Sequence, residues 1–378
     1  MQYYIIAGEA SGDMHAANLM KELKKLDATT EFRCWGGDMM EAAGGKLVKH
    51  YRELAFMGFT EVVMNLRTIL RNIELCKKDL LLNKPDALIL VDYPGFNLRI
   101  AEFAKKNGIK VFYYISPQVW AWKQSRVHKI KNIVDRMFVI LPFEKDFYKR
   151  FNYDVDFVGH PLLDAIEDNS SNKSTELIDQ LTNQPIKQSN NIIAVLPGSR
   201  KQEISVMLPL MLSVIDKFPL YQFVIGAAPS LPVDFLKSLV QDKKVAVVSG
   251  QTYDLLFRST AALVTSGTAT LETALFEVPE VVCYKGGWMS YSIARMLVKV
   301  DYISLVNLIM EKEVVKELIQ NDLTTDYLVK ELEVLLNDKL RITQIKNDYI
   351  ELKKKLGGKG ASAKTAKLIY EAVRNDKK

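Results

Sequence analysis

Short apolar runs alternate with longer amphipathic runs along most of this chain of 378 residues, and this alternation constrains the fold more than any other feature. Nearly continuous apolar strands separated by helices form a parallel sheet that is covered on both faces. In the first half we expect strands at residues 3–7, 31–35, 87–91, 110–114, 137–140 and 155–158, and helices at residues 14–26 and 98–106. The pattern therefore predicts an α/β fold.

A polar stretch at residues 168–191 interrupts the alternation and suggests a linker. The alternation restarts at Ile192, and from about Lys316 the pattern is helical to the end of the chain. We therefore predict two Rossmann-like domains that face a cleft, with ligands bound at the carboxyl ends of their strands. The strands of the second domain are expected at residues 192–195, 222–225, 245–248, 261–264 and 280–284. The predicted bounds are 1–168 for the N-terminal domain, 169–191 for the linker, 192–345 for the C-terminal domain and 346–378 for a C-terminal helical segment.

The charge balance excludes some classes of protein. The net charge is +6, but Lys and Arg are interspersed with Asp and Glu, whereas a nucleic-acid-binding protein usually has a dense basic stripe. We therefore expect no nucleic-acid partner, and the excess positive charge fits anionic small substrates or an anionic membrane surface equally well. No apolar run reaches about 18 residues, so we expect no membrane span. The first residues are expected to form a strand rather than a signal peptide.

Neither a disulfide framework nor a metal site is predicted. Cys34, Cys76 and Cys283 are widely separated and belong to no cluster with histidine, which is typical of buried thiols in a reducing compartment. No Ser/His/Asp set and no group of carboxylates with metal-ligand spacing is evident. We therefore expect no metal ion and no cofactor.

Two turns in the second half carry residues suited to phosphate binding. Each follows a predicted strand, and together they contain Gly198, Ser199, Arg200, Ser266, Gly267 and Thr268. Backbone N–H groups at a helix N-terminus bind anions, and the planar guanidinium of an arginine matches phosphate oxygens. Either turn alone could be an ordinary strand-to-helix connection, but the pair predicts a bound nucleotide diphosphate.

Polar residues also follow predicted strands in the first half. Residues 8–13 contain two glycines without the GxGxxG spacing, and Ser11 or Asp13 could cap the next helix or contact a ligand. Asp92 follows the strand at residues 87–91, where partial desolvation would raise its pKa and let it accept a hydroxyl proton. Alternatively, Asp92 caps the helix that begins near Asn97.

Two apolar patterns have both a structural and a functional interpretation. Residues 59–73 are strongly amphipathic, which fits either a helix packed on the sheet or a helix that lies at a membrane interface or takes up acyl chains. Trp120 and Trp122 follow a predicted strand and precede a basic run. Periodicity favours packing of one tryptophan in the core, and the functional alternative is a wall that contacts sugar or lipid beside cations for a phosphate.

Nine segments occur together and in order between residue 3 and about residue 310. They are residues 8–13, 54–58, 91–97, 116–122, 141–145, 158–161, 196–200, 266–272 and 301–307. In this arrangement the chain resembles the lipid-A-disaccharide synthases of glycosyltransferase family 19. The resemblance implies a GT-B fold and an inverting transfer from UDP-2,3-diacylglucosamine to 2,3-diacylglucosamine 1-phosphate (lipid X). The products would be the β-1,6-linked lipid A disaccharide 1-phosphate and UDP.

Carried over position by position, the resemblance assigns roles to individual residues. Asp92 and Arg200 are implied as catalytic residues, Asp92 as the base and Arg200 as a group near the nucleotide phosphates. The UDP-sugar would be held by Gly198, Ser199, Arg200, Ser266, Gly267, Thr268, Glu272 and Asn307, and the acceptor side of the cleft would contain Glu9, Ser11, Asn97, Gln118 and Trp120. Gly95 stands where many members carry a second aspartate, which argues for Asp92 as the acting carboxylate.

The acylated substrates implied by the resemblance would be reached at a bilayer. The expected location is the cytoplasm, with peripheral association with the anionic surface of the inner membrane through Phe59, Val62, Val63 and Leu66. The helical residues 323–378 could pair two subunits in a homodimer. Two alternatives stay open: another UDP-sugar enzyme such as a UDP-N-acetylglucosamine 2-epimerase, and a non-catalytic, membrane-associated nucleotide-sugar binder.

Overall fold

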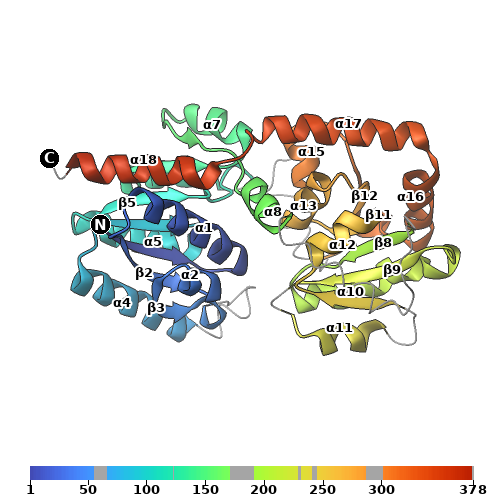
Figure 1. Ribbon diagram of the computed structural model, residues 1–378, viewed down its shortest axis with the longest axis horizontal. Helices are drawn as coiled ribbons and strands as arrows, with labels where there is room; N and C mark the ends of the chain where they lie inside the picture. The colour runs from blue at the N-terminus through green and yellow to red at the C-terminus, as the bar shows by residue number, and fades with distance from the viewer. Residues whose placement is uncertain are drawn as a thin grey trace. The chain divides into compact units, whose positions relative to one another are not determined.

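The computed structural model describes residues 1–54, 66–121, 123–170, 191–228, 231–240, 245–286 and 301–376 (Figure 1). The chain divides into two compact units, one formed by Met1–Asp164 with Leu356–Lys378 and the other by Ala165–Lys355. Each unit contains one parallel sheet with helices packed on it. The predicted fold class, with two Rossmann-like α/β units, is confirmed.

The first unit is built on a seven-stranded sheet in the order β3-β2-β1-β4-β5-β6-β7. All neighbouring strands are parallel. The strands are β1 (Gln2–Ala7), β2 (Glu31–Gly36), β3 (Gly45–His50), β4 (Ala87–Val91), β5 (Lys110–Tyr114), β6 (Arg136–Val139) and β7 (Asp156–Phe157). Every residue of β4 is fully buried, as expected for a central strand that is covered on both faces.

The helices of the first unit come from both ends of the chain. They are α1 (Ala10–Leu26), α2 (Asp38–Ala42), α4 (Leu66–Asn83), α5 (Pro94–Lys106), α6 (Arg126–Ile133), α7 (Pro142–Lys149) and α18 (Ala361–Asp376), with a 3-10 turn at Tyr51–Glu53. Helix α18, red in Figure 1, packs beside α1 and so returns the end of the chain to the unit in which it began. Helix α8 (Leu162–Ser170) spans the boundary between the two units.

The second unit has a six-stranded sheet in the order β10-β9-β8-β11-β12-β13, and its neighbouring strands are also parallel. The strands are β8 (Ile192–Leu196), β9 (Gln222–Ala227), β10 (Ala246–Ser249), β11 (Ser259–Thr265), β12 (Glu280–Tyr284) and β13 (Lys316–Ile319). The helices are α10 (Lys201–Met211), α11 (Val233–Val240), α12 (Thr252–Arg258), α13 (Thr268–Leu275), α15 (Leu305–Met310), α16 (Thr325–Asn337) and α17 (Lys339–Lys355), with 3-10 turns at Leu212–Lys217 and Gln320–Asp322.

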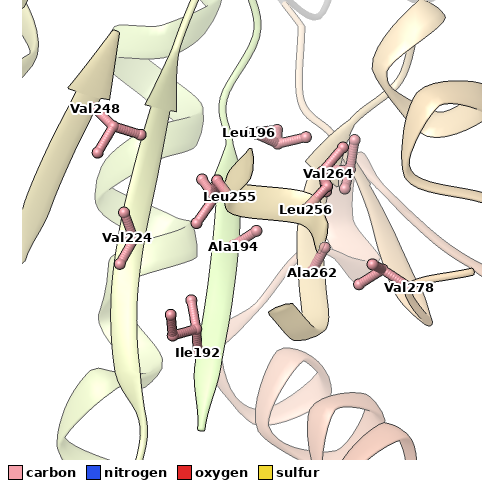
Figure 2. Packing of buried hydrophobic residues seen from close by; sticks show 10 residues of the cluster. All are labelled: Ile192, Ala194, Leu196, Val224, Val248, Leu255, Leu256, Ala262, Val264 and Val278. Atoms are coloured by element: carbon pink, nitrogen blue, oxygen red, sulfur yellow. The ribbon is translucent and has the colours of Figure 1, made fainter. Parts of the chain in front are cut away.

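Alternate residues of the central strands of the second unit form one face of its core. Figure 2 shows Ala194 of β8 and Val264 of β11 with Leu255 and Leu256 of α12 packed over them. All four side chains are buried, and burying a leucine of this kind contributes about 1.5–3 kcal/mol. This packing fixes α12 on the sheet and keeps the ends of β8 and β11 side by side.

The end of the chain differs from the sequence expectation. The prediction that the chain is helical from about Lys316 is wrong, because residues 316–319 form β13, which pairs with β12. Its composition of Lys, Glu, Leu and Ile suits a helix as well as a strand, and the pairing with β12 decides between them. Strand β3 at the edge of the first sheet was also missed. The predicted domain boundary at residue 345 falls inside α17, and only the segment from Leu356 onward belongs with the first unit.

The order of the strands gives each sheet one topological switch point, which is the place where two neighbouring strands lead on in opposite directions. In the first sheet the chain builds outward from β1 in one direction and then restarts at β4 on the other side of β1. In the second sheet β8 and β11 have the same relationship. Loops after such neighbouring strands diverge and leave room for a ligand at their carboxyl ends. The residues after β1, β4, β8 and β11 are therefore the first place to look for function.

Candidate active site

A carboxylate stands at the switch point of the first unit. Asp92 follows β4 and is partly exposed, and Glu9 follows the neighbouring strand β1. Burial, reinforced by the negative charge of Glu9, raises the pKa of Asp92 to about 7. A carboxyl with a pKa near neutrality is ionised in a useful fraction of molecules and is also a strong enough base to accept a hydroxyl proton. The alternative role for Asp92, as the cap of helix α5, is not observed, because Tyr93 is the residue that precedes the helix.

The turn after β1 holds two of the predicted residues near this carboxylate. Glu9 directly precedes α1, and Ser11 is exposed in its first turn. The alternative in which Ser11 or Asp13 caps α1 is not observed, since neither side chain does so. Asp13 is instead buried, and its carboxylate accepts hydrogen bonds from the backbone N–H groups of Gly37, Met39 and Met40, which caps the start of α2.

Two predicted acceptor residues prove to be buried. Asn97 is 0% exposed and donates through Nδ2 to the carbonyl oxygens of Asp92 and Val91, so it does not face a ligand. Trp120 is also buried, and its ring packs edge-on against Phe143. Gln118, by contrast, is exposed in the loop after β5. Trp122 lies outside the described residues.

One polar residue near Asp92 was not predicted. Glu144 on α7 is buried, and its carboxylate accepts hydrogen bonds from the hydroxyl of Ser116 and from the N–H groups of Ile140 and Leu141. Burial raises the pKa of Glu144 to about 7 despite these donors, and the charge of Asp92 acts in the same direction. A proline at the first helical position followed by a glutamate two residues later is a recognisable capping signal, but the burial of that glutamate cannot be read from the sequence.

The second unit presents a turn at the end of β8. Gly198 has a φ of +100°, and a Cβ atom there would lie 2.9 Å from Cγ2 of Thr265, so only glycine fits the position. Ser199 and Arg200 are exposed, and Arg200 directly precedes α10. Its Nη1 donates to Oε1 of Glu203 at 3.0 Å, and its side chain is 60% exposed. Arg200 thus occupies the N-cap position of α10, and the N–H groups in the first turn of a helix have no partner within that helix.

A second turn of the same kind follows the neighbouring strand β11. Gly267 has a φ of +151° and directly precedes α13, while Thr268 is exposed at the start of that helix. Ser266 donates from Oγ to the carbonyl oxygen of Ile303 at 2.9 Å, which fixes the turn to the loop before α15. Because β8 and β11 are paired, the N-termini of α10 and α13 lie at the same edge of one sheet. Two helix N-termini and one guanidinium together favour a diphosphate.

The last two predicted UDP contacts, Glu272 and Asn307, have different surroundings. Glu272 on α13 accepts a hydrogen bond from the hydroxyl of Tyr253 at 3.3 Å, and burial raises its pKa. Asn307 is fully buried: Nδ2 donates to Glu317 and to the carbonyl oxygen of Val315, and Oδ1 accepts from the N–H groups of Val314 and Val315. Its amide is committed to the interior, so a direct contact with a nucleotide is not supported.

Asn307 instead supports the second turn. Glu317 of β13 accepts hydrogen bonds from Asn307 and from the N–H groups of Ile303 and Ser304, and Ile303 in turn accepts from Ser266. This chain of contacts reaches from the edge strand to the turn that begins α13. Glu317 was not predicted, because one charged residue in an amphipathic run carries no signal for contacts with a distant loop.

The predicted membrane residues are described only in part. Phe59, Val62 and Val63 lie outside the described residues, whereas Leu66 begins α4 and is 49% exposed. Within the described ranges, no helix combines the length and the apolar character needed to cross a bilayer. The same ranges contain no group of three or more His, Cys, Asp or Glu side chains placed to hold a metal ion.

Two Rossmann-like α/β units in one chain are the architecture of the GT-B class of proteins. Solved structures of this class match nearly the whole chain. UDP-GlcNAc 2-epimerase from Neisseria meningitidis, bound to UDP-GlcNAc, has a TM-score of 0.68 at 16% identity and covers 99% of this chain and 100% of its own. The glycotransferase of kitacinnamycin has a TM-score of 0.66 at 13% identity and covers 98% and 99%. At these identities the likeness shows the fold alone.

Sequence relatives identify the family. The family model described as lipid-A-disaccharide synthetase matches residues 3–373. The lipid-A-disaccharide synthase of Syntrophus aciditrophicus is 41% identical over 98% of this chain and 97% of its own length, and that of Nitrosococcus oceani is 40% identical over 98% and 96%. The chain belongs to the lipid-A-disaccharide synthase family and is an enzyme of the glycosyltransferase type, which confirms the expectation from the nine sequence segments.

Proposed function

We propose that this enzyme transfers the sugar of UDP-2,3-diacylglucosamine to the 6-hydroxyl of 2,3-diacylglucosamine 1-phosphate, with inversion at the anomeric carbon. The products are the β-1,6-linked disaccharide 1-phosphate and UDP. Family membership supports the reaction, and the observation that carries the mechanism is Asp92, a partly buried carboxylate at a switch point with a pKa of about 7. Its relatives are named for the product of this reaction.

The proposed chemistry divides between the two units. The 6-hydroxyl oxygen of the acceptor attacks the anomeric carbon while the bond from that carbon to the UDP oxygen breaks. The hydroxyl proton passes to Asp92, and the electron pair of the broken bond leaves on the diphosphate. A positioned general base contributes roughly 10²–10⁴-fold to such a step.

The negative charge that develops on the departing diphosphate must be stabilised by hydrogen-bond donors. We assign this role to Arg200 and to the backbone N–H groups at the starts of α10 and α13, which the turns at Gly198 and Gly267 leave accessible. One preorganised donor of this kind typically contributes about 3–4 kcal/mol in the transition state. Asn307 and Glu317 support this site by holding the loop that anchors Ser266.

We also propose that the enzyme binds the anionic surface of a bilayer from the cytoplasmic side. Leu66 and Leu70 lie one turn apart on α4, and both are exposed, with Arg67 and Arg71 exposed beside them. Exposed leucines flanked by arginines suit a helix that lies in the membrane interface and contacts anionic head groups. Substrates with acyl chains would be reached from this surface.

A mass-spectrometric assay tests the proposed reaction directly. Purified enzyme is incubated with UDP-2,3-diacylglucosamine and lipid X, and we expect the disaccharide 1-phosphate and UDP in equal amounts. Parallel reactions with UDP-GlcNAc alone test the epimerase alternative, for which the observed fold is also suited. Epimerisation of UDP-GlcNAc without disaccharide formation would overturn the proposal. Binding of UDP without any UDP release when acceptor is added would identify a non-catalytic binder.

A further inference from the structure

The turn that carries Asp92 has an unusual backbone. Asp92 has a φ of +44° and Tyr93 a φ of +48°, so two consecutive residues with side chains adopt the left-handed region. This conformation is strained for residues with side chains and persists only where the surroundings hold it. The conformation ends β4 abruptly and starts α5 two residues later.

Two buried side chains hold this turn through one atom. The carbonyl oxygen of Asp92 accepts a hydrogen bond from Oη of Tyr113 at 2.6 Å and another from Nδ2 of Asn97 at 2.7 Å. Nδ2 of Asn97 also donates to the carbonyl oxygen of Val91 at 3.3 Å. Asn97 lies on α5 and Tyr113 on β5, and both are fully buried. The peptide of Asp92 is therefore held from two separate elements.

The next residue of the turn is held as well. The hydroxyl of Tyr93 donates to the carbonyl oxygen of Leu54 at 2.9 Å. The ring of Tyr93 lies against Gly8, where an added Cβ atom would come within 2.3 Å of it. These contacts locate Tyr93 through its side chain. The N–H of Asp92 donates to the carbonyl oxygen of Tyr114 at 3.3 Å, and its carbonyl oxygen is bound by Asn97 and Tyr113.

The environment of Asn97 indicates that its amide group is needed there. Oδ1 of Asn97 is buried and has no hydrogen-bond partner among the described residues. Leaving a buried polar atom unpaired destabilises the folded protein, and an apolar side chain of similar shape would avoid this effect. The stabilising contribution of the asparagine is its Nδ2 donor, which forms hydrogen bonds to the turn.

We propose that Asn97 and Tyr113 are positioning residues for Asp92: by binding its carbonyl oxygen they hold the left-handed turn that aims its carboxylate at the acceptor. This inference rests on the proposed role of Asp92 as the base. Neither side chain contacts substrate, and Tyr113 had no signal in the sequence, where it is one aromatic residue in an apolar strand.

The groups that interact electrostatically with the Asp92 carboxylate come from several elements. Glu9 before α1 raises the pKa of Asp92, and the backbone N–H of Tyr93 lowers it. Asp92 in turn raises the pKa of Glu144 on α7 and of Tyr113 on β5. Loosening the turn would let water reach the carboxylate, and its pKa would fall toward the ordinary value of an aspartate. A carboxylate with a lower pKa is a weaker base, and a displacement of about 1 Å alone can reduce the rate by up to about a hundredfold.

Three variants test the proposal in the full-length enzyme. Tyr113→Phe removes one donor and keeps the ring, and Asn97→Leu removes the other at similar volume. Tyr114→Phe is the matched control, because Tyr114 is the next residue on β5, is equally buried and points to the opposite face of the sheet. For each variant we measure kcat between pH 5 and 9 in the disaccharide assay, the Kd of UDP and the thermal midpoint.

We expect kcat to fall about tenfold in Tyr113→Phe and further in Asn97→Leu. The acidic limb of the pH profile should move to lower pH in both, while the Kd of UDP stays within about twofold of wild type, since UDP is assigned to the other unit. Tyr114→Phe should keep the wild-type kcat and profile. If Asn97→Leu fails to fold, Tyr113→Phe decides the question alone.

Two other outcomes would contradict the proposal in distinguishable ways. In the first outcome, Asp92→Asn is inactive, but Tyr113→Phe and Asn97→Leu either match Tyr114→Phe or lose kcat without a shift of the acidic limb. The positioning role is then wrong, and the assignment of Asp92 as the base is retained. If Asp92→Asn retains wild-type activity, the base itself is misassigned, and the positioning role fails with it.

Discussion

The guanidinium of Arg200 is held by Glu203, three residues further along the same helix start, at 3.0 Å between Nη1 and Oε1. The Arg200 side chain is 60% exposed and lies at the carboxyl end of β8. Because the side chain is largely exposed, the ion pair contributes little to stability, and the charge is available to a ligand.

We therefore expect Arg200→Ala to lower kcat by at least about a hundredfold, since it removes a donor to the departing diphosphate. The thermal midpoint should change by no more than about one degree, because no buried contact is lost. Glu203→Gln is the matched control, since it releases the guanidinium without removing it, and it should retain most of the activity. An Arg200→Ala enzyme with near-normal turnover would remove the arginine from the mechanism.

Asp92→Asn should abolish most of the activity without weakening the binding of UDP. The amide is similar in size to the carboxylate but cannot accept the proton, and a loss of roughly 10²–10⁴-fold is expected. Kinetics and calorimetric titration with UDP separate the two effects. An equal loss of UDP affinity would instead identify Asp92 as a ligand of the donor.

The pH dependence gives an independent check on the same carboxylate. The base acts in its ionised form, and burial raises the pKa of Asp92 to about 7. The activity of the wild-type enzyme should therefore rise with pH through about 7 rather than through 4. Glu144 has a pKa raised to about the same value, so the profile reports on the pair of carboxylates. The Glu144→Gln variant measures the contribution of Glu144 to the pH profile of activity. If the acidic limb of the profile remains near pH 7 in that variant, the limb reports the ionisation of Asp92.

Much of the fold could be predicted because burial on both faces leaves a simple pattern. Residues 87–91 are all apolar and form β4 with the predicted bounds, and the predicted strands at residues 110–114 and 280–284 are equally accurate. Strand β13 could not be found in this way, because only one of its four residues is buried and its charged residues suit a helix. A polar edge strand is specified by its partner in the sheet rather than by its own sequence.

The candidate site could be predicted in position but not in orientation. The motifs located the turns after β4, β8 and β11, because the chemistry of a turn depends on residues next to one another. Asn97 and Asn307 were predicted to face a ligand, yet both amides bond to backbone groups inside their own unit. Glu317 bonds to a loop that is distant in sequence, and such a contact exists only after the sheet has formed.

Negative charges introduced at two exposed leucines of α4 test the proposed membrane contact. Leu66→Glu together with Leu70→Glu should reduce binding to anionic vesicles by at least about tenfold, because each buried leucine contributes about 1.5–3 kcal/mol. Leu82→Glu is the matched control, since Leu82 is 82% exposed at the other end of the same helix. Vesicle flotation gives the measurement. Equal release by the control would indicate a general charge effect, and unchanged binding of the double variant would move the contact elsewhere.

From the burial of Glu280 we predict that the protein loses stability as pH rises, independently of catalysis. It begins β12, is 0% exposed, and neither carboxylate oxygen has a hydrogen-bond partner among the described residues. Burial, with the charge of Glu317, raises its pKa well above the usual value, so the folded protein releases this proton at a higher pH than the unfolded chain does. Between the two pKa values the unfolded chain binds fewer protons than the folded chain, and the free energy of unfolding therefore falls as pH rises. The fall is about 1.4 kcal/mol per pH unit up to the pKa of the folded state.

Replacing this carboxyl should remove the penalty. Glu280→Met keeps the length of the side chain without a titrating group, and we expect it to unfold at a higher denaturant concentration than wild type at pH 8. The advantage should shrink toward pH 5, where the wild-type carboxyl is protonated in more of the unfolded chains as well. Glu333→Gln, an exposed change on α16, controls for the loss of one negative charge. Urea denaturation of the three proteins between pH 5 and 8 gives the comparison. A Glu280→Met protein that is less stable at every pH would mean that the carboxyl makes a contact worth more than its burial costs.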